Sequence, residues 1–364
     1  MMYYYKNNYS TPVNQPKKIL LKHVGNMGDH LFLVGPALEV LSQQYPQTEI
    51  TLVTAWGYKD HKGHWGERNQ DGFCISLMQE NPHIDHLVHW HDKILSLEGE
   101  ICHEGGKSYP TWNKKHYESV KKDYDLVAEL DFGLGIFDNP VEKVFEQLGL
   151  KNIVNGNYPF YGSENDWKVG KSVAEQFPGP RIVFLESING QTMRGWDPEK
   201  TIQLENKIKT DLGITPIWFG AKYPKTFDGR GLTLRENIAF AGSCDIGIGV
   251  MSGPLHFAAA AGLQTICLYG GQPLHRAAPS FFLNPHISDP KKYHITIDGP
   301  TCNVPCFLKR EKPCKNLSPT EAKSAKFRSW QEPGRQSDKS CVATIAVDLV
   351  FAELVSALKT RGLI

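Results

Sequence analysis

Short apolar runs alternate along the chain with longer amphipathic segments, an arrangement typical of strands that are each followed by a helix. The first such unit comprises ILLKHV after Lys18, the glycine-bearing turn GNMGDH and the amphipathic segment LFLVGPALEVLSQQYP. Further strands are expected at 49–56, 86–92 and 124–132, separated by segments long enough for crossover helices. The first half of the chain therefore predicts a parallel α/β sheet.

The alternation of strands and helices restarts beyond a segment rich in proline and glycine. This segment, 155–180, contains one expected helix and marks a domain boundary. Beyond it we expect a helix in WDPEKTIQLENKIKTDLG, an amphipathic helix over 342–360, and strands at 181–187, 215–220, 246–250 and 265–270. The expected divisions are residues 1–160, residues 161–341 and a C-terminal helix within 342–364.

Composition agrees with two globular domains and argues against several other classes of protein. The 364 residues exceed what one core usually supports, and 40% hydrophobic with 22% charged residues is typical of folded proteins. A net charge of +1 does not favour nucleic acid or an acidic membrane surface as the partner. The N-terminus has no apolar signal-peptide core and no run of about 18 apolar residues follows, so we expect a cytoplasmic protein with at most peripheral membrane contact.

The turn GNMGDH is the first candidate site. It follows the first strand, where ligands of open α/β sheets bind, and its glycines allow a tight turn and a close approach of substrate. Asp29 would then point its carboxylate toward the ligand, although it could equally be a helix N-cap. The turn is not GxGxxG and the next strand ends in Trp56 rather than an acidic residue, which weakens a nicotinamide-binding interpretation.

A second candidate site is a helix that begins after the strand at 246–250. Ser252 and Gly253 form the turn, and Pro254 suits the first helical position. Open backbone amides and the positive end of the helix dipole favour an anion such as a diphosphate. His256 could donate a further hydrogen bond or could be a packed helical histidine, and the alanines at 258–261 would let helix and sheet pack closely.

The eight cysteines fall into two groups. Without a signal peptide, reduced thiols are expected, and Cys74, Cys102, Cys244 and Cys267 are interpreted as small buried hydrophobic residues. The others offer four thiolates, enough for a tetrahedral zinc or iron, or remain unpaired thiols. Four protein ligands leave no open coordination position, so a metal there would be structural; the four are Cys302, Cys306, Cys314 and Cys341.

Four segments together resemble glycosyltransferase family 9, the heptosyltransferases: GNMGDH, FLESINGQTMRGWDPE, GVMSGPLHFAAAAGLQTICLYGGQP and the cysteine-rich tail. The resemblance implies GT-B architecture, with two Rossmann-like domains whose parallel sheets face a central cleft. Residues 1–160 would bind the acceptor and residues 161–341 the nucleotide sugar. It also implies inverting transfer of a sugar, expected to be heptose, from a nucleotide-diphosphate donor to a hydroxyl of a lipopolysaccharide-core or protein acceptor, without an organic cofactor.

Residue roles follow from the same resemblance. Asp29 matches the catalytic base, and Arg194, ahead of Trp196, matches the basic residue that binds the donor phosphates. Two positions depart from the family pattern, because Met251 and Lys222 stand where acidic residues are usual, so the nucleotide base stays open. The implied contacts to the nucleotide sugar are Asn26, Gly28, Ser187, Asn189, Thr192, Lys222, Met251, Ser252, Gly253, Pro254, Leu255 and His256.

Several alternatives stay open on the sequence alone. Glu129 and Asp131, at the end of the strand expected at 124–132, are second candidates for the base, whereas Lys22 is interpreted as a satisfied strand residue. The chain could instead be a nucleotide-sugar epimerase or another GT-B enzyme. A catalytically silent scaffold organised around a metal would be a different class of protein. The donor sugar, the acceptor and the oligomeric state are not specified by these patterns.

Overall fold

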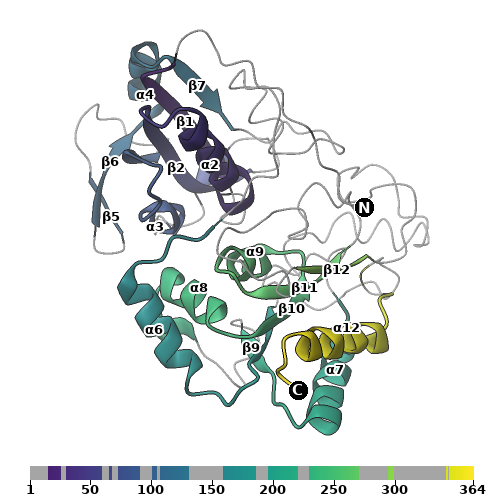
Figure 1. Cartoon of the computed structure of the whole chain (residues 1–364). Helices are drawn as coiled ribbons and strands as arrows, with labels where there is room; N and C mark the ends of the chain where they lie inside the picture. The colour runs from purple at the N-terminus through teal and green to yellow at the C-terminus, as the bar shows by residue number, and fades with distance from the viewer. Residues whose placement is uncertain are drawn as a thin grey trace. The chain divides into compact units, whose positions relative to one another are not determined.

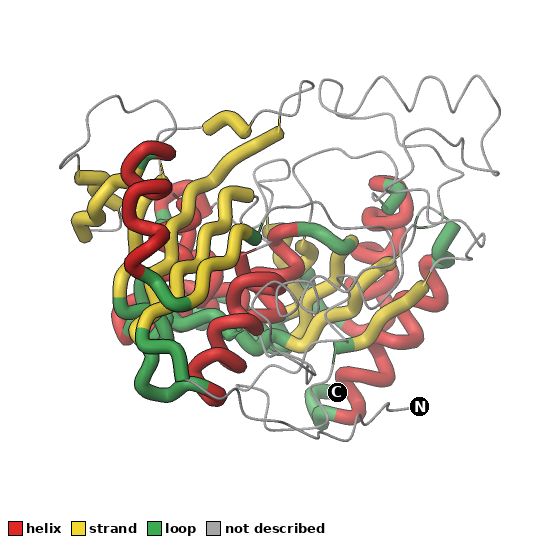
Figure 2. The backbone as a smooth tube through the Cα atoms, turned by 90° about the horizontal axis from the view of Figure 1, so that it is seen from above, coloured by secondary structure: helices red, strands yellow, loops and turns green. Residues whose placement is uncertain are grey.

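The computed structural model describes residues 15–25, 30–59, 65–67, 73–90, 101–104, 107–130, 159–185, 196–219, 229–269, 294–298, 342 and 344–364. The chain divides into two compact units, Met1–Ser163 and Glu164–Ile364 (Figure 1). Figure 2 shows the helices, in red, running along the strands of each sheet, in yellow. None of the described helices is long and apolar enough to cross a membrane.

Unit 1 contains a seven-stranded sheet in the order β5-β6-β4-β2-β1-β7, with β3 paired to β2. The strands β4, β2, β1 and β7 are parallel, as expected. The strand β6, which was not predicted, is parallel to β4, whereas β3 and β5 are antiparallel to their neighbours. The prediction of a purely parallel sheet is therefore wrong at these two strands. Residues 105 and 106, which separate β5 from β6, are both glycine, a pair that favours hairpins. The strands are β1 Lys18–Gly25, β2 Glu49–Lys59, β3 Trp65–Glu67, β4 His86–Trp90, β5 Ile101–Glu104, β6 Lys107–Trp112 and β7 Leu126–Glu129.

The order of strands reverses beside β1. The chain builds outward from β1 to β2 and β4, and then returns to add β7 on the other side of β1. The carboxyl ends of β1 and β7 therefore form a topological switch point, the usual ligand position in such sheets. The helical segments of unit 1 are the π-helix η1 His30–Val34, α2 Gly35–Gln44, α3 Phe73–Met78, α4 Lys114–Val120 and the 3-10 turn η2 Lys121–Asp123.

Unit 2 contains a five-stranded sheet in the order β12-β11-β10-β8-β9, and all of its pairings are parallel. The chain runs from β8 to β9 on one side and returns to β10 on the other, which puts a second switch point at the carboxyl ends of β8 and β10. The strand β12 was not predicted. The strands are β8 Ile182–Leu185, β9 Ile217–Phe219, β10 Ile246–Val250, β11 Gln264–Tyr269 and β12 Ile295–Asp298.

Local signals explain where the helices of unit 2 begin and end. Asp197 caps α7 by accepting from the backbone N of Glu199 at 2.9 Å, and Gly213, with φ of 69°, ends it. Thr233 and Glu236 form a capping box at the start of α8. The helical segments are α6 Glu164–Ala174, α7 Pro198–Leu212, η3 Gly229–Gly231, α8 Leu234–Gly242, α9 Gly253–Ala260 and α12 Val347–Thr360.

The C-terminal helix begins later than expected. Helical spacing of apolar residues predicts a start at 342, but α12 begins at Val347. Val342 and Ile345 do belong to the apolar core, which they enter from the turn that precedes the helix. The same core contains side chains of α7, with which α12 packs (Figure 1). The indole of Trp196 anchors this turn by donating from Nε1 to the carbonyl of Ile345 at 3.0 Å.

Candidate functional site

At the switch point of unit 2, the two strands that precede the predicted segments, β8 and β10, end side by side. β8 ends at Leu185, which pairs with Gly249 near the end of β10. The two backbones approach closely, because a Cβ added at Gly249 would lie 2.3 Å from the carbonyl oxygen of Leu185. The segment after β8 contains Ser187, Asn189, Thr192 and Arg194, which lie outside the described residues, as does Lys222.

The segment after β10 is the start of α9, and its N-cap geometry is unusual. Ser252 is the N-cap in an extended conformation, yet its side chain makes no capping hydrogen bond. Gly253 takes the first helical position and Pro254 the second, so the expectation of Pro254 at the first position is wrong by one residue. Because proline has no N–H, the first turn presents the backbone amides of Gly253 and Leu255, whereas the amide of His256 bonds to the carbonyl of Ser252 at 3.1 Å.

The hydroxyl of Ser252 has no hydrogen-bond partner among the described residues, although only 8% of the residue is exposed. A buried hydroxyl without a partner costs about 1–3 kcal/mol. An oxygen of a bound ligand at this helix start would supply the missing partner. A Cβ added at Gly253 would meet only the ring of Phe257, at 3.7 Å, so the first turn is otherwise open.

Three other predicted residues of this segment are buried. Met251 and Leu255 pack inside unit 2, so at this turn they would offer backbone groups rather than side chains to a ligand. His256 is 2% exposed. This burial favours the interpretation of His256 as a packed helical histidine over that of a phosphate ligand.

At the switch point of unit 1, the turn with Asn26, Gly28 and Asp29 lies outside the described residues, but both of its flanks are described. His23 and His30, one on each flank, are fully buried and their rings contact edge to face with centroids 4.5 Å apart. Nδ1 of His23 lies 2.8 Å from the carbonyl oxygen of Leu130, beyond β7, and Nε2 of His30 is hydrogen bonded to the hydroxyl of Thr54 on β2. Burial lowers the pKa of His23 to about 4 and outweighs the opposing effect of the bond to Leu130.

This pair of histidines was not predicted from the sequence. A signal was present, since one histidine precedes the glycine turn and another directly follows Asp29. Their partners, at Thr54 and Leu130, are remote in the sequence and could not be inferred from the local pattern.

The second candidate base, Glu129, is engaged elsewhere. Its carboxylate accepts from Nζ of Lys121 at 3.0 Å. Burial raises the pKa of Glu129, but the bond from Lys121 and the charge of Lys22 leave that pKa below its usual value. A carboxylate with a lowered pKa is a poor general base. Nζ of Lys22 lies 3.8 Å from the ring centroid of Trp90, which agrees with its interpretation as a satisfied strand residue, and Asp131 lies outside the described residues.

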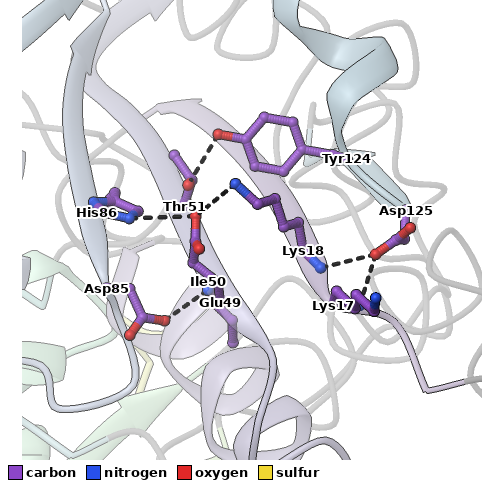
Figure 3. A network of polar contacts seen from close by, with 9 residues as sticks. All are labelled: Lys17, Lys18, Glu49, Ile50, Thr51, Asp85, His86, Tyr124 and Asp125. Carbon is purple, nitrogen blue, oxygen red and sulfur yellow. Dashed lines mark hydrogen bonds and ion pairs between the residues drawn. The ribbon is translucent and has the colours of Figure 1, made fainter.

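The opposite end of the same sheet holds a polar network (Figure 3). Asp125 accepts from the backbone N of Lys17 at 2.6 Å and of Lys18 at 2.9 Å, and Asp85 accepts from the backbone N of Ile50 at 2.7 Å. These carboxylates bind the amides where β1 and β2 begin. The network therefore anchors the amino ends of the strands, away from the predicted site.

The predicted metal ligands Cys302, Cys306, Cys314 and Cys341 lie outside the described residues. Within the part of the chain that the structure describes, no group of three or more histidine, cysteine or acidic residues is placed to hold a metal ion. Cys244 and Cys267 are free and buried, as expected for small hydrophobic residues. Burial raises the pKa of the Cys244 thiol to about 12. The side chains of Cys74 and Cys102 are not among those described.

Comparison with known proteins shows the fold. The chain matches no protein-family model, and a search of curated proteins finds no significant match. Among solved structures it is similar to a glycosyl transferase family 9 protein from Veillonella parvula, with a TM-score of 0.56, 18% identity, and coverage of 94% of this chain and 97% of that chain.

Two further structures are similar over most of their length. The ADP-heptose lps heptosyltransferase II of E. coli has a TM-score of 0.57 and 15% identity, over 95% of this chain and 99% of that chain. The iron-containing dodecameric glycosyltransferase TibC from enterotoxigenic E. coli has a TM-score of 0.53 and 11% identity, over 95% of this chain and 77% of that chain. The chain therefore shares its α/β fold, with a parallel sheet in unit 2 and a mainly parallel sheet in unit 1, with glycosyltransferases of the heptosyltransferase kind.

Proposed function

We propose that the chain is a glycosyltransferase of heptosyltransferase type, which transfers a sugar, expected to be heptose, from a nucleotide-diphosphate donor to a hydroxyl of a lipopolysaccharide-core or protein acceptor. The observation that carries the proposal is the start of α9 at the switch point of unit 2, where the buried hydroxyl of Ser252 has no partner among the residues that the structure describes. The fold shared with a heptosyltransferase and a family 9 protein supports it.

In this proposal the diphosphate of the donor binds at the start of α9. The amides of Gly253 and Leu255 and the hydroxyl of Ser252 would donate to its oxygens, and the positive end of the helix dipole would favour its charge. Arg194, in the segment that follows β8 in the sequence, would add a cation. Contacts from Ser187, Asn189, Thr192 and Lys222 stay predictions.

The proposed reaction is a single displacement at the anomeric carbon. The oxygen of the acceptor hydroxyl forms the new bond as the bond to the diphosphate oxygen breaks, and Asp29 takes the proton of that hydroxyl. Arg194 and the start of α9 stabilise the charge that develops on the departing diphosphate. We further propose the GT-B arrangement, in which the carboxyl ends of both sheets border one cleft, with Asn26 and Gly28 beside the bound sugar.

Binding of nucleoside diphosphates to Ser252→Ala tests the donor site. The lost hydroxyl has no partner among the described residues, so we expect the melting temperature to be unchanged or raised, while affinity for the preferred diphosphate falls about tenfold. Titration calorimetry with ADP, GDP, UDP, CDP and TDP measures the affinity and identifies the base.

Ser243→Ala is the matched control. The hydroxyl of Ser243 donates to the carbonyl of Ala239 at 2.8 Å, so its loss should lower the melting temperature and leave diphosphate affinity unchanged. If the wild-type chain binds none of the five diphosphates at millimolar concentration, the transferase proposal fails and the silent scaffold becomes the better explanation. A nucleotide-sugar epimerase would bind the donor but alter its sugar without transfer.

We also propose a structural zinc or iron at Cys302, Cys306, Cys314 and Cys341, supported by their number and spacing. TibC, with which the chain shares its fold, is described as iron-containing. Elemental analysis should find one zinc or iron per chain and less in Cys306→Ser. A cytoplasmic location with at most peripheral membrane contact stays a prediction.

A further inference from the structure

The turn that bears Asp29 lies between two buried histidines. His23 stands on β1 shortly before the turn, and His30 follows Asp29 directly as the first residue of the π-helix η1. Both are 0% exposed. Single π-helical turns are rare and occur frequently at functional sites.

His23 ties the start of the turn to the strand on one side of β1. A carbonyl oxygen only accepts hydrogen bonds, so Nδ1 of His23 carries the hydrogen that is donated to Leu130 at 2.8 Å. This bond fixes the tautomer of the ring and joins the end of β1 to the residue that follows β7. The lowered pKa of His23 keeps the ring neutral at pH 7, which agrees with this assignment.

His30 ties the end of the turn to the strand on the other side of β1. Its Nε2 is hydrogen bonded to the hydroxyl of Thr54, which is also fully buried and stands on β2. Its ring contacts that of His23 at an interplanar angle of 65°. The two ends of the turn are thereby fixed to each other and to both neighbours of the central strand.

A cluster of apolar side chains would fill the same space without the free-energy cost of desolvating polar groups. Two imidazoles and a hydroxyl must be desolvated to occupy this interior, and each is stabilised there only in the geometry that completes its hydrogen bond. Polar groups that are satisfied in one arrangement specify that arrangement more narrowly than packing alone. The cluster therefore favours one conformation at the flanks of the turn.

We propose that His23, His30 and Thr54 are positioning residues that fix both flanks of the segment that bears Asp29 and thereby support its role as the base, an inference that rests on the proposed function. They touch neither substrate nor donor. They act by raising the fraction of molecules in which the base is correctly placed. Misplacement of a reacting group can lower the reaction rate by about a hundredfold.

Thr54→Val removes the hydroxyl that holds His30 and keeps the shape of the side chain. Thr51→Val is the matched control, because Thr51 is another buried threonine of β2, whose hydroxyl accepts from Tyr124 at 3.1 Å near the opposite end of the strand. Hydrogen exchange of the peptide that spans 23–34 reports on the turn without any need for activity. Steady-state kinetics of sugar transfer reports on the consequence.

We expect exchange in this peptide to be about tenfold faster in Thr54→Val than in Thr51→Val, with similar losses in melting temperature. The kcat should fall at least about tenfold in Thr54→Val only, with the KM for the donor unchanged, because binding is retained while orientation is lost. His30→Phe, which keeps an aromatic ring, should have the same effect, and Thr54→Ser should restore both values.

Equal exchange in the two valine variants would overturn the proposal, and so would faster exchange in Thr54→Val without a greater loss of kcat. Failure of the proposed function has a different signature. In that case the wild-type chain transfers no sugar from any nucleotide donor, and the exchange measurement still decides whether the histidines hold the turn.

Discussion

Asp166 and Arg235 form an ion pair in the interior of unit 2. Nη2 and Nε of Arg235 lie 2.9 and 3.0 Å from the same carboxylate oxygen, and both residues are buried. Asp166→Asn removes the carboxylate charge that lies against the buried guanidinium, so we expect the free energy of unfolding to fall by about 3–5 kcal/mol in urea titrations.

The control for this ion pair is Glu175→Gln, which removes the exposed ion pair of Glu175 with Lys171 at 3.9 Å. Exposed ion pairs contribute about 0–1 kcal/mol, so this variant should unfold close to the wild type. Equal effects of the two substitutions would show that the pair of Asp166 and Arg235 is not desolvated as described.

The buried ring of His23 makes stability depend on pH. Its pKa is about 4 in the folded chain against 6.5 for the free group, so between these values the unfolded chain binds a proton that the folded chain does not. The free energy of unfolding should therefore fall by about 3 kcal/mol as the pH drops from 6.5 to 4, with no contribution from His23 above that range. Urea titrations of wild type and His23→Gln across pH 4–8 measure the difference.

His23→Gln is expected to be less stable at neutral pH but to have a flatter dependence below pH 6.5. His86→Gln provides the comparison, since the ring of His86 is largely exposed beside Glu49. This variant keeps His23 and should therefore keep the loss of stability below pH 6.5 that His23 causes. A wild-type curve parallel to that of His23→Gln would contradict the assignment.

At the residue scale, the sequence located the start of α9 but not the contacts around it. Glycine and proline at 253–254 were recognisable because helix starts have local signatures. The tight turn around Asp29 stays a prediction. The contacts of His23 and His30 depend on Thr54 and Leu130, which only the folded sheet brings near. Sequence patterns also could not show that the hydroxyl of Ser252 is left without a capping bond.

At the scale of the elements, the same hydrogen bond from a backbone amide to an aspartate recurs where strands begin. Asp85, Asp125 and Asp245 each directly precede a strand and accept from a backbone amide at or just before the start of the neighbouring strand, the last from Arg181 at 2.7 Å. Figure 3 shows the first two of these carboxylates. Each aspartate provides a hydrogen-bond acceptor for a backbone amide at the amino ends of the strands, where the sheet itself provides none.

Helices α6 and α8 pack so closely that a methyl group does not fit between them. A Cβ added at Gly170 would lie 2.4 Å from the backbone N of Phe240 and 2.5 Å from the carbonyl carbon of Ala239. Gly170→Ala should therefore lower the free energy of unfolding by about 1–3 kcal/mol, although the same change inside an exposed helix is stabilising. Denaturant titration shows directly whether Gly170→Ala lowers or raises the free energy of unfolding.

Gly231→Ala is the matched substitution, because a Cβ there would have nothing within 4 Å. It should leave stability within about 0.5 kcal/mol of the wild type. A stabilised Gly170→Ala would mean that α6 and α8 are further apart than described.

The elements themselves were largely predictable. Parallel strands buried on both faces form continuous apolar runs, and those runs indicated the strands at the centre of each sheet. The antiparallel β3 and β5, the parallel β6 and the four-residue β12 were missed, because short peripheral strands carry too few residues for a period to be read. The start of α12 was placed too early because Val342 and Ile345 are core residues that happen to continue its helical spacing.

At the scale of the whole molecule, each unit has a core of its own. The C-terminal helix illustrates this, since Leu354 is 0% exposed in the core that α12 shares with α7 and the sheet of unit 2. Leu354→Ala should lower the free energy of unfolding of unit 2 by about 2–5 kcal/mol and leave unit 1 unaffected. Pulse proteolysis in urea, with peptides of each unit counted by mass spectrometry, separates the two.

Leu349, on the same helix, is 47% exposed. Leu349→Ala should therefore leave both units within about 0.5 kcal/mol of the wild type. If Leu354→Ala destabilises the two units equally, they unfold as one cooperative body rather than around separate cores.

The strands that border the two sheets are short. As far as the structure describes them, β5, β7 and β12 have four residues each and β9 has three, whereas the central β1 and β2 have eight and eleven. Aggregation of β-proteins often begins when an unpaired edge strand serves as a template for a strand of another molecule. Within the residues that the structure describes, this template is three or four residues long, so the concentrated protein should resist the growth of fibrils by strand addition.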